Sequence, residues 1–212
     1  MKKCYIFGAG ELFGSPTVSS SDLIIAADGG TAHLKSLGIK PDMIVGDFDS
    51  MGSSFSEKCE DPELSGVEIA RFPVKKDDTD MMLAYKIGAS RGYDEFHIYG
   101  GVGGREDHTF ANYSLLLYAK NEGKTAFLYN KTSRVRVIKN EKIELHGAKG
   151  KTVSLFAFGG EARGVFVSGL EYELSGGTLS VDFPLGVSNS HGHGGFATVE
   201  VKDGALIVFE EL

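Results

Sequence analysis

Tryptophan is absent from this chain of 212 residues, cysteine is scarce, and no long apolar run occurs. The two cysteines, Cys4 and Cys59, stand alone, which excludes a disulfide framework and the paired spacing of a zinc site. No segment approaches the roughly 20 apolar residues of a membrane-spanning helix, and the apolar segment after Met1 is too short for a signal peptide. We therefore expect a reduced, cytoplasmic protein without a membrane partner.

Blocks of basic residues are also missing. The net charge is −7, and acidic and basic residues are interleaved along the chain. An acidic protein has no general attraction for phosphate backbones, so we expect no nucleic-acid partner. The sequence contains no G-x-x-x-x-G-K-[ST] motif and no protein-kinase glycine loop with its partner motifs, which excludes P-loop enzymes and protein kinases.

The first part of the chain alternates between short apolar strands and helical segments. A helix that starts at Asp78 or Thr79 ends before Gly92, because Asp and Thr favour the start of a helix and Gly its end. Other helices are expected at 31–37 and 107–121, and strands at 4–7, 23–27, 43–45, 67–72, 96–99 and 126–129. This order predicts an α/β domain over 1–130, with a mostly parallel, Rossmann-like sheet covered on both faces.

The remainder, 131–212, has no helical period and is expected to form a smaller all-β domain, a sandwich or a barrel. The turn Lys202-Asp203-Gly204 lies between two apolar runs and predicts a β-hairpin. Strands are predicted at 135–138, 142–145, 152–158, 179–183, 196–201 and 205–209.

Carboxylates or glycines follow four consecutive strands of the α/β domain. In an open parallel sheet, ligands bind beyond the carboxyl ends of the strands, so these residues should meet at one edge. Each group alone is typical of a turn or a helix cap, but converging carboxylates repel one another unless a cation lies among them. Mg²⁺ prefers such oxygen ligands together with substrate phosphates. The residues are Asp28, Asp47, Asp49, Asp77, Asp78, Asp80 and the stretch 100–107.

Positive charge near this edge is sparse. Arg105 lies among glycines whose amides can approach a phosphate, although a solvent-exposed loop arginine is the alternative. His108 could donate to phosphate or transfer a proton, or it could be structural. In the second domain, His191 and His193 could hold a metal, but a mobile loop between strands is the favoured interpretation.

Four segments, in this order and at these spacings, resemble the thiamine pyrophosphokinase family of bacterial type: Asp28-Gly29-Gly30, Gly46-Asp47-Phe48-Asp49-Ser50, Lys76-Asp77-Asp78-Thr79-Asp80 and Gly103-Gly104-Arg105-Glu106-Asp107-His108. The resemblance implies an enzyme that transfers a diphosphoryl group from ATP to the hydroxyl of thiamine and releases AMP. It also implies a homodimer, in which the α/β domain holds ATP and Mg²⁺. Thiamine would then lie between this domain and the β-domain of the partner subunit.

The resemblance also implies roles for individual residues. The catalytic and metal-binding positions are Asp47, Asp49, Asp77 and Asp80. The nucleotide or phosphate positions are Asp28, Lys76, Thr79, Arg105, Asp107 and His108. The positions that face thiamine are Ser188 and Asn189. The sequence departs from the family at Ser190, where members often carry an acidic residue. Because tryptophan is absent, Phe183 and His191 are the candidates for stacking on thiamine.

Two other classes of function use the same residues. A metal-dependent phosphohydrolase would release phosphate or diphosphate without an alcohol substrate. A non-catalytic nucleotide-binding module would bind nucleotide without turnover. The separate β-domain favours the kinase over the hydrolase, because an organic acceptor needs walls that water does not. Dense carboxylates disfavour the binding module, because binding alone would not require so much negative charge near phosphates.

Overall fold

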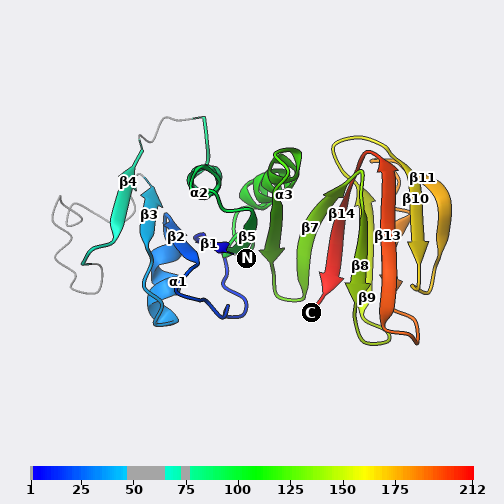
Figure 1. Ribbon diagram of the computed structural model, residues 1–212, viewed down its shortest axis with the longest axis horizontal. Helices are drawn as coiled ribbons and strands as arrows, with labels where there is room; N and C mark the ends of the chain where they lie inside the picture. Colours follow the sequence, from blue (N-terminus) through cyan, green and yellow to red (C-terminus); the bar gives the residue numbers. More distant parts are fainter. Residues whose placement is uncertain (1, 47–64, 73–76) are drawn as a thin grey trace. The chain divides into compact units, whose positions relative to one another are not determined.

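A computed structural model describes residues 2–46, 65–72 and 77–212, in two compact units (Figure 1). The first unit comprises Met1–Leu115 and Leu128–Lys131, and the second comprises Leu116–Phe127 and Thr132–Leu212. The predicted domain boundary at 130/131 stays a prediction. The second unit also includes the end of one helix and the start of one strand that precede this boundary in the sequence. No helix in the described part of the chain is long and apolar enough to cross a membrane.

The first unit contains a parallel sheet with helices between its strands. The strands are β1 (Lys3–Phe7), β2 (Leu23–Ala27), β3 (Met43–Gly46), β4 (Glu68–Arg71), β5 (Glu95–Tyr99) and β6 (Thr125–Tyr129), and the helices are α1 (Gly30–Ser36), α2 (Asp80–Ser90) and α3 (Glu106–Asn121). Five strands pair in parallel in the order β5-β1-β2-β3-β4. The predicted α/β class, with a mostly parallel sheet, is confirmed.

Helices cover both faces of this sheet because successive side chains of a buried strand point to opposite sides. Phe7 packs in one apolar cluster with Leu34 of α1. Cys4 and Phe96 lie under Gly88 of α2, where an added Cβ would come within 2.8 Å of either side chain. Figure 1 shows α1 and α2 on opposite sides of the strands. The nearly continuous apolar runs of these strands reflect burial on both faces.

The chain reverses its direction of strand addition between β1 and β5, which are neighbours in the sheet. The segments after these two strands are joined by main-chain hydrogen bonds, from Gly8 N to Tyr99 O at 2.8 Å and from Gly10 N to Gly100 O at 2.8 Å. Gly100 has a φ of +62°, and a Cβ there would lie 2.3 Å from Gly8 O. Only glycine allows this close approach at the topological switch point.

The second unit is a sandwich of two antiparallel sheets. Its strands are β7 (Ser133–Lys139), β8 (Lys142–His146), β9 (Thr152–Ala157), β10 (Ala162–Ser168), β11 (Leu174–Leu179), β12 (Gly186–Ser190), β13 (Phe196–Asp203) and β14 (Ala205–Glu211). In one sheet the neighbouring strands of this unit are β12-β9-β14-β7, and the other sheet has the order β11-β10-β13-β8. Val165, Val199 and Val208 are fully buried in the core between them, each stabilising the fold by about 1.5–3 kcal/mol. The predicted all-β domain is confirmed, as a sandwich.

The strand predicted at 179–183 is wrong. Strand β11 ends at Leu179, which pairs with Ala162, the first residue of β10. Beyond that point β10 offers no main-chain partner, so Val181 and Phe183 alternate along an exposed non-strand segment. The sequence does not predict strands β10, β11 and β12, because glycine and polar residues interrupt their pattern.

Candidate functional site

A cleft of about 400 Å³ opens in the first unit beyond the carboxyl ends of β1 and β2. Gly8 and Ala9 line it after β1, and Ala27 and Asp28 after β2. The start of α2 contributes residues 78–81, and the start of α3 contributes side chains from 105 to 112. The cleft therefore lies at the topological switch point, where open α/β sheets bind ligands.

The start of α2 places two carboxylate residues, Asp78 and Asp80, beside the cleft. Thr79 is the N-cap, and its hydroxyl oxygen accepts a hydrogen bond from Met82 N at 3.1 Å. Of the two predicted caps, the structure selects Thr79. Asp80 lies in the first turn, where a negative charge is favourable. Asp78 accepts two hydrogen bonds of 2.8 Å from Lys86, which fixes its carboxylate beside the cleft.

Replacing the cap should loosen this end of α2. We expect Thr79→Ala to lower the free energy of unfolding by about 1 kcal/mol, because Met82 N loses its acceptor. Urea unfolding of both proteins measures the difference. Thr79→Ser keeps the hydroxyl and should remain near the wild-type stability; equal losses in the two variants would contradict the capping role.

Asp28 has an unusual main-chain conformation for a residue with a side chain. Its φ is +49°, and its amide donates to Val45 O at 2.8 Å. The left-handed region is uncommon for residues other than glycine, although aspartate tolerates it better than most. The hydrogen bond to β3 holds this conformation, which places Asp28 in the wall of the cleft.

Arg105 supplies positive charge to the lining of the same cleft. Its guanidinium donates to Asp107 from Nε at 3.1 Å and from Nη2 at 2.6 Å, and both side chains are exposed. These bonds from Arg105 hold the pKa of Asp107 below its usual range, with a further contribution from the main-chain amide of His108. An exposed pair of this kind is weak in water. The guanidinium can therefore exchange Asp107 for the oxygens of a phosphate.

The predicted nucleotide and metal residues have different outcomes. The cleft brings five of them together: Asp28, Thr79, Asp80, Arg105 and His108. Asp77 and Asp107 are exposed and are not among its lining residues. Asp47, Asp49 and Lys76 lie outside the described residues. In the ranges that the structure describes, no three His, Cys, Asp or Glu side chains are grouped closely enough to hold a metal ion.

The sequence predicts Asp78 among the strand-end carboxylates of this edge but gives it no individual role, and it does not indicate Asn112 at all. Asn112 is buried, and its Nδ2 donates to Gly101 O at 2.7 Å, which ties the glycine-rich loop to α3. Spacing could have indicated Asn112 as a site residue, because it follows His108 by four residues and therefore shares its helix face.

In the second unit, Ser188 and Asn189 lie on β12 with opposite exposures. Ser188 is exposed with a φ of +58°, and its amide donates to Ser154 Oγ at 3.0 Å. Asn189 is buried: Oδ1 accepts from Tyr172 N at 3.0 Å and from Ser190 N at 2.9 Å, and Nδ2 donates to Tyr172 O at 2.6 Å. The amide of Asn189 thus anchors β12 to the segment around Tyr172. Its contact with thiamine stays a prediction.

His191 is only 4% exposed, so its ring is covered and cannot form an open stacking surface. Its main-chain amide donates to Lys151 O at 2.9 Å, and its Nδ1 has no hydrogen-bond partner. The side chain lines a pocket together with Arg134, His146 and Glu210. Burial lowers the pKa of His191; His146 adds to this effect and Glu210 opposes it.

The lowered pKa of His191 predicts a loss of stability in acid. Above about pH 6.5 the imidazole is neutral in both the folded and the unfolded chain. As the pH falls below that value, the unfolded chain binds the proton first, so the free energy of unfolding decreases until the lower folded pKa is reached. We expect His191→Gln to show a smaller decrease between pH 7.5 and 5.5 in urea unfolding. The exposed His193→Gln variant is the control, and identical decreases in His191→Gln and the wild type would contradict the prediction.

Comparison with known proteins shows two family matches. Residues 15–128 match the family described as "Thiamin pyrophosphokinase, catalytic domain". Residues 134–206 match "Thiamin pyrophosphokinase, vitamin B1 binding domain". A curated relative, "Thiamine pyrophosphokinase" of Bacillus subtilis, is 26% identical over 178 residues, which are 82% of each chain.

Solved structures have the same fold. The thiamine pyrophosphokinase from Bacillus subtilis has a TM-score of 0.86 at 24% identity, over 99% of this chain and 98% of that one. The thiamin pyrophosphokinase from Candida albicans has a TM-score of 0.72 at 16% identity, over 99% and 90%. At these identities the likeness shows the fold alone.

Proposed function

We propose a site and a mechanism from one premise: this chain belongs to the thiamin pyrophosphokinase family, whose catalytic domain it matches over 15–128 and whose vitamin B1 binding domain it matches over 134–206. It is a diphosphotransferase that makes thiamine diphosphate, with thiamine and ATP as substrates. The observation that carries the site is the cleft at the switch point, which gathers carboxylates, an arginine and a histidine. In this proposal, 1–130 binds ATP and 131–212 binds thiamine.

The phosphates of ATP lie in the cleft, against the segment after β1 and the start of α3. Gly8 lines this part of the cleft, where its lack of a side chain lets the main chain pack against Gly100 O and Met81. Arg105 leaves Asp107 and donates to the phosphates with its planar fork. His108 donates from the next turn of α3. Lys76 and Asp107 complete the nucleotide side, as the family pattern implies.

Mg²⁺ is the proposed metal, with Asp47, Asp49, Asp77 and Asp80 as the candidate ligands. The donor chemistry fits: Asp80 and Asp28 line the cleft with carboxylate oxygens, which are the ligands Mg²⁺ prefers. When bound, the metal neutralises charge on the phosphate oxygens. Within the described residues, Asp78 is turned toward Lys86, so it serves as a charged wall rather than a ligand.

The residues of the chain position the reactants for in-line attack by the thiamine hydroxyl on the β-phosphorus. Arg105 stabilises the negative charge that spreads over the phosphate oxygens in the transition state. Asp80 or Asp49 accepts the hydroxyl proton. A carboxylate is a weak base for an alcohol, so this transfer comes late, after the bond to phosphorus has begun to form. Thr79 and Asn112 hold the starts of α2 and α3 in place.

In this proposal Ser188 and Asn189 face thiamine.

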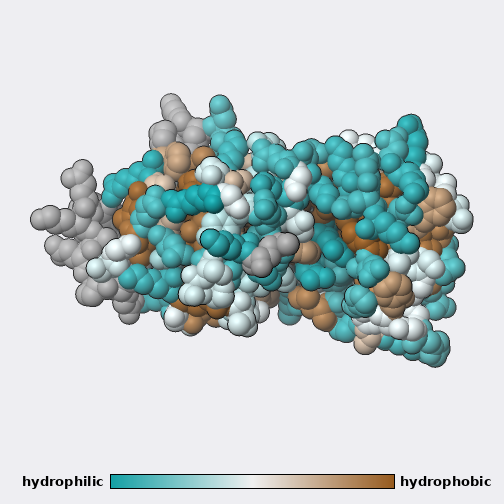
Figure 2. Space-filling model, viewed as in Figure 1, coloured by the Kyte–Doolittle hydropathy of each residue, from teal (hydrophilic) through white to brown (hydrophobic). Residues whose placement is uncertain are grey.

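The protein is a homodimer in the cytoplasm in this proposal. The segment that leads into Ser188 exposes four apolar side chains: Val181, Phe183, Leu185 and Val187. Figure 2 shows that apolar surface interrupts the mainly hydrophilic face in view. Apolar groups on a short segment favour burial against a second copy. Light scattering after gel filtration measures the mass; a monomer at micromolar concentration would contradict the dimer.

Product analysis tests the reaction. Purified protein is mixed with ATP, Mg²⁺ and thiamine, and each component is omitted in turn before the phosphorus products are identified by NMR. We expect AMP and thiamine diphosphate in equal amounts, both dependent on thiamine. ADP or free phosphate formed regardless of thiamine would indicate a hydrolase instead. Nucleotide binding without any product would indicate a binding module.

A further inference from the structure

Asn112 is a buried polar side chain that joins α3 to the chain beyond β5. Only 5% of Asn112 is exposed, yet it lines the cleft from the second turn of α3. Its Nδ2 donates to Gly101 O at 2.7 Å. This hydrogen bond therefore ties the helix to the segment that leaves β5 at the topological switch point.

Three successive main-chain carbonyls beyond β5 have fixed partners. The segment after β1 donates to Gly100 O at 2.8 Å and to Val102 O at 2.7 Å. The carbonyl between them, Gly101 O, bonds the side chain of Asn112 instead. Asn112 thus supplies the donor that the segment after β1 does not supply, and it holds this loop from the side of α3.

The surroundings of Gly101 leave little room for another donor. A Cβ at this position would lie 2.6 Å from Leu128 Cδ1 and 3.1 Å from Ile98 Cγ2, and both of these side chains are fully buried. A buried carbonyl that loses its donor costs its full desolvation free energy unless the main chain shifts to find a new partner. Removal of the Asn112 amide should therefore displace the loop or the start of α3.

Arg105 moves with the start of α3. Its carbonyl accepts a hydrogen bond of 3.1 Å from the amide of Thr109, inside the first turn of the helix. Before it stand Gly103 and Gly104, whose φ angles of +75° and +127° lie in a region that restrains glycine little. The position of Arg105 in the cleft therefore depends on how α3 is docked beyond β5.

Resting on the function proposed above, we infer that Asn112 is a positioning residue for the diphosphoryl transfer. Its hydrogen bond to Gly101 docks α3 so that the guanidinium of Arg105 reaches the phosphates of ATP. Asn112 acts through Arg105 rather than on the substrate, since its Nδ2 is already bonded to Gly101 O. Loss of the hydrogen bond weakens the binding of ATP and leaves the binding of thiamine unchanged.

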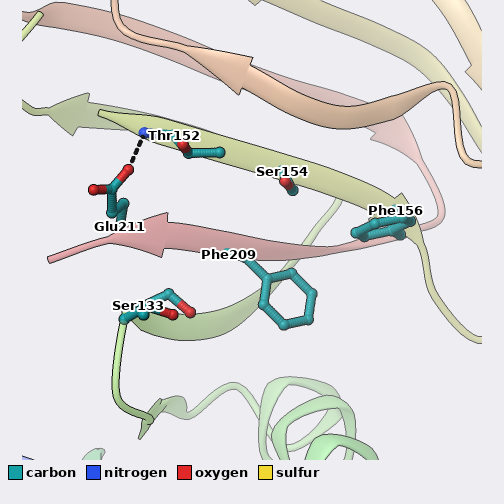
Figure 3. A pocket seen from close by; sticks show the side chains of 7 residues that line it. Ser133, Thr152, Ser154, Phe156, Phe209 and Glu211 are labelled. Atoms are coloured by element: carbon teal, nitrogen blue, oxygen red, sulfur yellow. Dashed lines mark hydrogen bonds between the residues drawn. The ribbon is translucent and has the colours of Figure 1, made fainter. Parts of the chain in front are cut away.

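The first test removes the donor. Steady-state kinetics of Asn112→Ala should show a KM for ATP raised roughly five- to twentyfold, with the KM for thiamine unchanged, because Gly101 O is left unsatisfied. Glu211→Ala is the matched control. The carboxylate of Glu211 accepts a hydrogen bond of 2.8 Å from Thr152 N beside a cavity of the second unit, and Glu211 does not line the cleft (Figure 3). This control loses a bond between a side chain and the main chain of nearly the same length, and it should keep the wild-type KM for ATP.

A double-mutant cycle tests whether Asn112 acts through Arg105. If it does, the KM for ATP in Arg105→Ala/Asn112→Ala rises by less than the product of the two single rises, because a displaced Arg105 has already lost part of its contact. The full product would show that Asn112 acts independently of Arg105, as a direct contact with ATP would. An unchanged KM for ATP in Asn112→Ala would show that Asn112 only supports the fold. Either result overturns the inference.

Binding measurements separate this inference from the function it rests on. Calorimetric titration of ATP gives the Kd of the wild type and of each variant without any turnover. A wild type that makes no thiamine diphosphate overturns the proposed function, while a Kd for ATP raised in Asn112→Ala still supports the inference and an equal Kd overturns it. Thermal melting identifies loss of fold. If Asn112→Ala does not fold, Asn112→Ser, which keeps a shorter donor, takes its place with an expected rise of roughly two- to fivefold.

Discussion

The Asp80→Asn variant should lose about 10²–10⁴-fold in kcat while keeping its fold. Asp80 lines the cleft from the first turn of α2, where a carboxylate can bind the metal or accept the thiamine proton. Asparagine keeps the volume of the side chain but can do neither at neutral pH. The loss of charge near the helix start should cost only about 0.3–1 kcal/mol of stability. Steady-state kinetics with ATP and thiamine, together with thermal melting, measures both effects.

Asp94→Asn is the control for Asp80→Asn, because Asp94 is an exposed aspartate of the same unit that does not line the cleft. It should keep wild-type kcat. Near-wild-type turnover in Asp80→Asn, with unchanged melting, would remove Asp80 from the catalytic and metal-binding set. A large loss in both variants would show that the activity responds to net charge rather than to this position.

The Arg105→Ala variant should raise the KM for ATP roughly 10- to 100-fold, the effect of losing charge-assisted hydrogen bonds to phosphate. Its stability should change little, since the side chain of Arg105 is 71% exposed and its partner Asp107 is 63% exposed. Kinetics at varied ATP and saturating thiamine measures the effect. An increase confined to the KM for thiamine would show that Arg105 contacts thiamine and not ATP, and would contradict the prediction.

Arg163→Ala supplies a matched control for this variant. Arg163 also pairs with a carboxylate two residues away, Glu161, at 2.7 Å, and both side chains are similarly exposed, at 62% and 50%. Arg163 lies on β10 of the second unit and does not line the cleft. Its removal therefore measures the effect of losing a comparable surface ion pair elsewhere on the protein. We expect its KM for ATP to equal that of the wild type.

Local patterns of the sequence determined the order and type of most elements. The apolar runs of β1, β2, β3 and β5 are nearly continuous because both faces of the parallel sheet are buried. The cap at Thr79 and the left-handed Gly92 lie where α2 starts and just beyond its end, because these residues satisfy or relax the ends of a helix. The rule that strand ends form the binding edge then placed Asp28, Asp80 and Arg105 together.

Only the tertiary structure decided what each candidate contacts. The family resemblance gives a role to Asp77 and none to Asp78, yet in the structure Asp78 lines the cleft and Asp77 does not. Asn189 is buried against the main chain around Tyr172, a pairing over 17 residues that no local pattern encodes. The pairing of β14 with β9 and β7 joins residues that lie about 50 and 75 positions apart in the sequence. Such contacts arise from chain topology, so they cannot be predicted from composition and periodicity.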